Sequence, residues 1–167
     1  MLVSAELVRM HFEYTAWASA RLVGAAAQLT PEELTRDFGS ADKSVLGTLV
    51  HIFAADRIWF ARVHGTTLAA FVSPADHDLT VLQREWPALY ARWKVWAASL
   101  TDVSLNEEHS YTDMKGNPYQ TPLWQICLHV VNHASHHRGQ VSAFLRALGK
   151  TPPPLDLIYH YREKLAA

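Results

Sequence analysis

The sequence predicts an all-α fold, a four-helix bundle with a long connection between its third and fourth long helices. Four long segments repeat apolar residues at spacings of three and four, which is the period of an amphipathic helix. Turn signals separate them, and the last connection is long enough to hold a small hairpin. The 167 residues, 49% of them hydrophobic, suit one core. We therefore expect a single bundle domain over residues 1–167.

The first predicted helix runs from about Ser4 to Gln28, and its face repeats large side chains at helical spacing. The following stretch, "LTPEEL", is typical of a helix start. Thr30 can accept a hydrogen bond as the N-cap, Pro31 suits the first turn, and Glu33 completes a capping box. A short helix or turn is expected there.

The second predicted helix runs from about Ser44 to Val63 and ends near Gly65. It has a wide apolar face, and His51 lies on an adjoining face whose other residues are mostly small. Those neighbours are Gly47, Thr48, Ala54, Ala55 and Ile58.

The third predicted helix runs from about Thr80 to Leu100, with Thr80 and Gln83 as a capping box. Pro87 is expected to kink it or to shift its start. Its apolar stripe includes three tryptophans, which indicate a core or a dimer interface rather than a cofactor platform. They are Trp86, Trp93 and Trp96.

Two short extended arms around a turn at residues 115–117 predict a hairpin between Glu108 and Thr121. The fourth helix is expected to begin at Thr121 and Pro122 and to end at Leu148, before Gly149. The tail, residues 155–167, can form a last short helix.

Composition excludes several classes of function. The formal net charge of -1 gives no basic surface for nucleic acid or for an anionic membrane. No apolar run approaches the roughly 20 residues that cross a bilayer. Cys127 is the only cysteine, so an intrachain disulfide is ruled out. A cytoplasmic protein is expected.

The stretch "NHASHHRGQV", residues 132–141, places three histidines in a helix with an apolar face. His133 and His137 are one turn apart and face inward, so both can bind one divalent ion. A third ligand must come from a facing helix, and His51 is the best candidate. Three neutral imidazoles suit Zn²⁺, Ni²⁺ or Fe²⁺, and the sequence does not choose among them.

A different interpretation of these histidines stays open. A single buried histidine is more often a hydrogen-bonded core residue than a ligand, and this applies to His51 taken alone. For the His133 and His137 pair the two interpretations weigh equally. A metal would offset the desolvation of two unpaired imidazoles.

Other polar residues receive lesser roles. His129 and Gln140, on the polar flank of the last helix, could orient ligands or substrate. His11 and Asp56 are weaker candidates, and a structural hydrogen bond is expected for Asp56. Arg138 is expected to point away from the ligand face, toward a helix end or an interface. Four further histidines are interpreted as surface residues: His64, His77, His109 and His160.

Three stretches together resemble the DinB-like (DinB/YfiT-like) family of inferred metalloenzymes. They are "YTAWASARLVGAAAQLTPEEL", "SVLGTLVHIFAADRIWFARVHG" and "PLWQICLHVVNHASHHRGQVSAFLRALGKTPPPLDLIYHY". The resemblance covers nearly the whole chain. It implies a four-helix bundle, often dimeric, with a divalent ion held at motif positions that correspond here to His51, His133 and His137. Relatives in the wider superfamily include thiol-dependent S-transferases and isomerases.

These observations favour a metal-dependent enzyme of the thiol S-transferase or a related type. Its expected partners are a small-molecule substrate, a low-molecular-weight thiol as a second cofactor, and a second copy of the chain. Two alternatives remain. One is a non-catalytic bundle with a structural or sensory metal, and the other is a metal-dependent hydrolase. A cleft that reaches the metal would favour an enzyme, while a sealed four-coordinate ion would favour a structural role.

Overall fold

The structure, a computed structural model, describes residues 3–68 and 70–166, so four positions of the predicted 1–167 domain (Met1, Leu2, Ala69 and Ala167) lie outside the described residues. None of the described helices is both long enough and apolar enough to span a membrane. The elements are α1 (Ala5–Ala26), α2 (Pro31–Thr35), α3 (Val45–Val63), the 3-10 helix η1 (Pro74–Asp76), α4 (Leu79–Ala98), α5 (Asp102–Asn106), β1 (Glu108–Thr112), β2 (Pro118–Pro122), α6 (Leu123–Ala147) and α7 (Leu157–Ala166).

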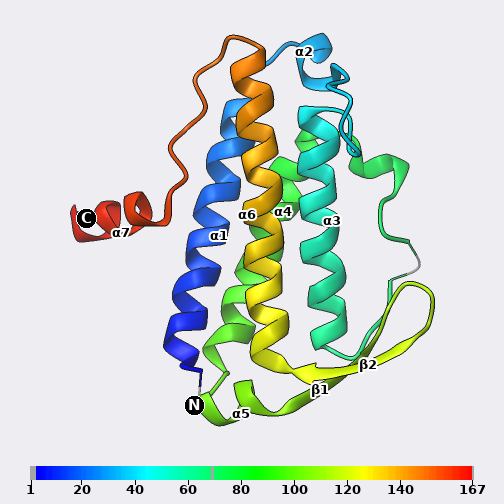
Figure 1. Ribbon diagram of the computed structural model, residues 1–167, viewed down its shortest axis with the longest axis vertical. Coiled ribbons are helices and arrows are strands. Elements are labelled where there is room, and N and C mark those ends of the chain that lie inside the picture. Colours follow the sequence, from blue (N-terminus) through cyan, green and yellow to red (C-terminus); the bar gives the residue numbers. More distant parts are fainter. Residues whose placement is uncertain (1–2, 69, 167) are drawn as a thin grey trace.

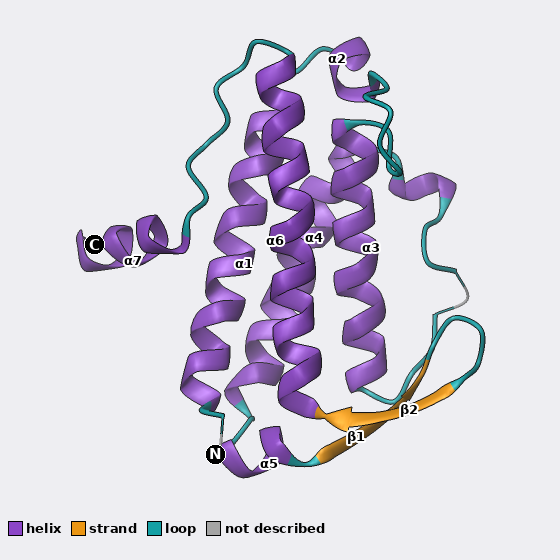
Figure 2. Ribbon diagram, viewed as in Figure 1, coloured by secondary structure: helices purple, strands orange, loops and turns teal. Residues whose placement is uncertain are grey.

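Four long helices, α1, α3, α4 and α6, lie side by side (Figure 1). The main helix pairs are α1 with α4, α3 with α6, and α1 with α6. Figure 2 shows the two strands as a hairpin at one end of these helices. The prediction of a mainly helical fold with a small hairpin before the last long helix is confirmed.

Helix caps follow the sequence in part. Thr30 and Glu33 form the predicted capping box of α2. The predicted box of Thr80 and Gln83 is wrong: α4 begins one residue earlier, and Asp78 is its N-cap, with a carboxylate oxygen 2.8 Å from the backbone nitrogen of Thr80. Thr121 does not cap α6, because it pairs with His109 in the hairpin. The short helices η1 and α5 were not predicted.

The hairpin is antiparallel and runs in register from Glu108 opposite Pro122 to Thr112 opposite Pro118. Its turn is held by Asp113, whose carboxylate accepts hydrogen bonds from the backbone nitrogens of Lys115 and Asn117. Gly116 has φ of 83°, a conformation that glycine adopts without steric cost.

The tryptophan stripe of α4 belongs largely to the core. Trp86 and Trp93 are almost fully buried, and Trp93 stacks on Phe12 of α1 with ring centroids 4.8 Å apart. Of the two predicted roles for this stripe, core or dimer interface, the core role is confirmed for these two side chains.

A buried series of hydrogen-bonded side chains connects all four long helices. Arg138 of α6 donates to the hydroxyls of Thr15 and Ser19 on α1, at 2.7 and 3.3 Å. The Ser19 hydroxyl lies 3.2 Å from that of Tyr90 on α4, and Tyr90 donates to Asp56 of α3 at 2.7 Å. Because the single proton of Tyr90 goes to Asp56, Ser19 must donate to Tyr90. Every hydrogen bond in this series therefore points from the cation, Arg138, toward the anion, Asp56.

These buried hydrogen bonds show where the two charged residues of the series lie. Arg138 is 2% exposed, so the expectation of a helix-end or interface position is wrong. The structural hydrogen bonds expected for Asp56 are confirmed: its carboxylate accepts from Tyr90 and also from Trp86, at 2.9 Å. The helical period placed Arg138 away from the histidines correctly, but that side of α6 packs against α1 rather than facing solvent.

The C-terminal segment returns to α1, and α7 projects from its side (Figure 1). Tyr14 donates to the backbone oxygen of Leu155, and Trp17 donates to Glu163. His160 lies between these two aromatic rings and is 6% exposed. The expectation that His160 is a surface residue is therefore wrong, because the predicted last helix covers α1.

Replacement of Asp56 by asparagine should make stability less sensitive to pH. Burial raises the pKa of Asp56 from 3.8 to about 6. The folded protein then binds more protons than the unfolded chain between these values, so this carboxyl lowers the free energy of unfolding as pH rises from about 4 to 6. The free energy of unfolding of Asp56→Asn, relative to that of the wild type, should increase by on the order of 3 kcal/mol between pH 4 and 7.5. Urea unfolding measures it.

Asp78→Asn is the control. The pKa of Asp78 is lowered by its hydrogen bonds with Thr80, so its contribution has the opposite pH dependence. Histidines titrate alike in each protein and cancel in the comparison. A stability difference between Asp56→Asn and wild type that does not change with pH would contradict the prediction.

Candidate metal centre

Three histidines meet where α3 packs against α6. His51 comes from α3, and His133 and His137 lie one turn apart on α6. One nitrogen from each ring lies within 4.8 Å of the others. The Nε2 atoms of His51 and His133 are 3.1 Å apart, and the ring of His137 lies 4.3 and 4.6 Å from those of His51 and His133, measured between centroids. The predicted residues are thus brought together.

This donor set fits a divalent ion. Metal–nitrogen bonds of about 2.0–2.1 Å at tetrahedral angles separate two ligand nitrogens by roughly 3.3 Å, close to the observed distance between His51 and His133. The Nδ1 atom of His137 lies 2.8 Å from the side-chain oxygen of Gln140. An oxygen acceptor there places the proton on Nδ1 and leaves the Nε2 lone pair for a metal.

The surroundings favour neutral imidazoles, which are the form that binds metals. Burial, together with the neighbouring His137, His51, His129 and His136, lowers the pKa of His133 to about 4. Burial lowers the pKa of His51 as well; nearby Asp42 opposes this, and His137 adds to it. Both shifts favour the neutral form of these two rings at neutral pH.

Asp42 is a polar partner of the site that the sequence did not reveal. Its two carboxylate oxygens lie 3.3 Å from Nδ1 of His51 and 3.7 Å from Nδ1 of His137. A carboxylate behind a ligand histidine fixes the ring orientation and raises its basicity. Gln140, one of the residues that the sequence suggested could orient a ligand, is hydrogen-bonded to Nδ1 of His137. No helical period could indicate Asp42, because it lies in the loop before α3.

Local backbone geometry holds Asp42 in this place. Lys43 adopts a positive φ of 63°, an uncommon conformation for a residue with a side chain. A Cβ atom at Gly47 would lie 2.0 Å from the backbone oxygen of Asp42, so only glycine allows the loop to pass this close to α3. Ser44 caps α3 by accepting from the backbone nitrogen of Gly47.

The histidines are not sealed from solvent. The side chains of His51 and His137 keep 24% and 13% of their exposure. Phe71, in the connection after α3, packs edge-on against His51 with ring centroids 5.3 Å apart. The side chains of both histidines are therefore partly accessible to solvent.

The remaining candidates lie outside the triad. His129 packs against Trp59, with 5.0 Å between ring centroids, and is 5.6 Å from His133. His11 forms a local hydrogen bond with the carbonyl of Leu7 on α1. Cys127 is 1% exposed, and burial raises its pKa to about 12, so its thiol is not a nucleophile at neutral pH.

Comparison with known proteins identifies the family of the chain. The DinB family profile matches residues 1–165. Protein DinB of Bacillus subtilis (strain 168) is 23% identical over 153 residues, covering 87% of this chain and 88% of that protein. The crystal structure of a DinB-like protein from Bacillus cereus ATCC 10987 has a TM-score of 0.65 at 20% identity, over 92% of this chain and 99% of that one, which shows a shared fold. The chain belongs to the DinB family.

Proposed function

We propose that this protein is a metal-dependent enzyme of the thiol S-transferase type, built as a single four-helix-bundle domain. His51, His133 and His137 would hold one divalent ion of zinc, nickel or iron. The observation that carries the proposal is the convergence of three imidazole nitrogens within 4.8 Å. Three protein ligands leave a coordination position open, as in catalytic rather than structural sites.

The chemistry of the surrounding residues supports an external thiol. When bound, a divalent ion would lower the pKa of a coordinated thiol and favour the nucleophilic thiolate. The buried thiol of Cys127 does not serve, so the thiol must be a second small molecule. Asp42 and Gln140 orient the histidine rings through their Nδ1 atoms. The partial exposure of His51 favours this function over that of a sealed structural ion.

Purified protein should contain about one divalent ion per chain. His137→Ala should lose most of it, because two imidazoles on different helices bind an ion far more weakly than three. His129→Ala is the matched control, since His129 lies one turn away on the same helix and outside the triad. Elemental analysis measures both variants.

Undiminished metal in His137→Ala would refute the assignment of ligands. An equal loss of metal in His129→Ala would also contradict the assignment, because it would make His129 a ligand as well.

A small thiol should change the coordination of the bound metal. With cobalt in place of the native ion, a thiol that binds the open position should produce a sulfur-to-metal charge-transfer band in the near ultraviolet. His133→Ala should lack this band. Cysteine and larger cellular thiols should each be tried, because the residues around the histidines can discriminate between thiols by size.

If no thiol gives the band or supports transfer to a model electrophile, while the ion still exchanges its water, the S-transferase function is wrong. A hydrolytic or non-catalytic role would then fit the site better.

We further propose a homodimer formed along α1 and α4. Two hollows of about 480 and 390 Å³ lie between these helices and share Ala16, Pro87 and Tyr90, so they form one continuous groove. Its lining is mainly apolar, and the occupant that we infer is the same face of a second copy.

The dimer should be lost when this groove is filled with charge. Light scattering at micromolar concentration should give twice the mass of one chain for the wild type and a single mass for Ala20→Glu, since Ala20 is an exposed groove residue. The exposed Val95, which does not line either hollow, provides Val95→Glu as the control that stays dimeric. A wild-type monomer would contradict the proposal.

A further inference from the structure

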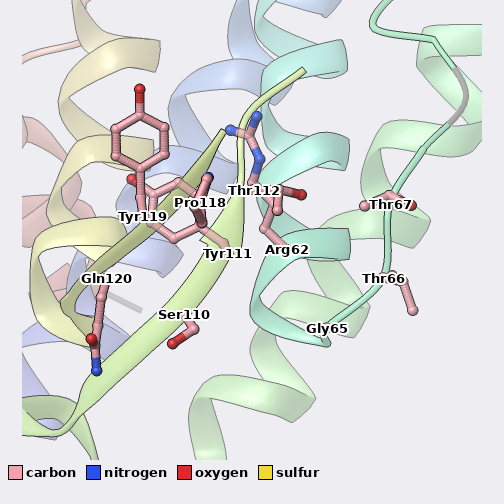
Figure 3. A pocket seen from close by; sticks show the side chains of 10 residues that line it. All are labelled: Arg62, Gly65, Thr66, Thr67, Ser110, Tyr111, Thr112, Pro118, Tyr119 and Gln120. Carbon is pink, nitrogen blue, oxygen red and sulfur yellow. The ribbon is translucent and has the colours of Figure 1, made fainter. Parts of the chain in front are cut away.

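Another hollow lies away from the histidines, between the hairpin and the end of α3. Its volume is about 560 Å³, within the range of small-molecule sites. Figure 3 shows Arg62 of α3 reaching toward the hairpin, with the 65–67 segment on the other side. Its lining includes Arg62 of α3 and two tyrosines of the hairpin, Tyr111 and Tyr119.

Aromatic rings hold the guanidinium of Arg62 in place. Its central carbon lies 4.5 Å from the ring centroid of Trp59 and 5.6 Å from that of Tyr111. Stacking of this kind occupies the faces of the guanidinium and leaves its N–H edges for hydrogen bonds. The side chain is half-buried, so a bond formed at this edge is only partly screened by water.

Within the described part of the chain, the guanidinium of Arg62 forms no ion pair. Burial lowers the pKa of Arg62, and the nearby Tyr111 and Asp113 oppose this shift. That carboxylate, however, already accepts hydrogen bonds from Lys115 and from both the backbone and the side chain of Asn117. A guanidinium that is held in place and forms no ion pair is suited to binding an anion from solution.

The rest of the lining specifies more than charge. Ser110 and Thr112 also line the hollow, and strand alternation places their side chains on the face of β1 opposite Tyr111. Tyr111 and Tyr119 stack on each other with ring centroids 5.7 Å apart and an interplanar angle of 21°. Tyr119 is still 48% exposed, so a flat apolar group can pack against it.

We propose that this hollow binds a small carboxylic acid that carries an aromatic ring. The carboxylate pairs with the two-pronged edge of Arg62, which matches it in geometry. The ring packs against the tyrosine pair, on the same side of the hairpin as the guanidinium.

This site is separate from the candidate metal centre. Arg62 follows His51 by eleven residues on α3, which places it about 16 Å further along the helix. Trp59 and His129 pack together between the two sites. Binding of the acid should therefore not require a metal, and the proposal stands independently of the proposed function.

Calorimetric titration of the full chain with benzoate, benzamide and acetate tests the proposal. Metal-free protein should bind benzoate at one site. It should bind benzamide, which lacks the charge, and acetate, which lacks the ring, at least tenfold more weakly. Arg62→Gln should weaken benzoate binding tenfold or more, and Arg62→Lys should fall between. The matched control is Arg92→Gln, because Arg92 also stacks on an aromatic ring, Phe60, but lies outside the hollow.

Benzoate affinity unchanged in Arg62→Gln would overturn the proposal. So would binding that disappears on removal of metal, or in His137→Ala, since the acid would then bind at the histidines. If Arg62→Gln does not fold, Tyr119→Ala provides the test. This variant should bind benzoate more weakly than the wild type does and acetate with the same affinity. A benzoate affinity equal to that of the wild type would reject the site.

Discussion

The buried chain of hydrogen bonds from Arg138 to Asp56 sets the relative positions of the four long helices. It takes one or two residues from each helix and has a charge of opposite sign at each end. A shift of one helix by a single turn would leave a buried charge without its partner, which costs several kcal/mol. Since Arg138 follows His137 directly in α6, the interaction that fixes the helix register also fixes the two histidines opposite His51.

The helical period was sufficient to predict most of the fold. Apolar spacing located the long helices, and capping residues located the short α2. The helical period could not show what the polar faces of these helices contact. A charged residue at position 138 looks like a surface residue in any sequence pattern, and only the hydroxyls of Thr15 and Ser19, from a helix more than a hundred residues earlier, make its burial tolerable.

The same distinction applies to the site. His133 and His137 share a helix, so their spacing alone brought them together, and the small neighbours of His51 correctly indicated the facing residue. Asp42 and Arg62 were not found, for different reasons. Asp42 depends on the path of a loop, and Arg62 depends on a hairpin whose Tyr111 reaches across to α3. Neither path has a periodic signal in the sequence.

The close passage of the Asp42 loop over Gly47 makes one stretch of the chain indivisible. A loop with a left-handed lysine, a capping serine and a glycine without room for a side chain leads directly into the helix that carries His51. Moving the three histidines to another helical scaffold would therefore reproduce the nitrogen atoms but not their orientation. In grafting this centre, or in exchanging segments between relatives, residues 42–51 have to be transferred as a single cassette.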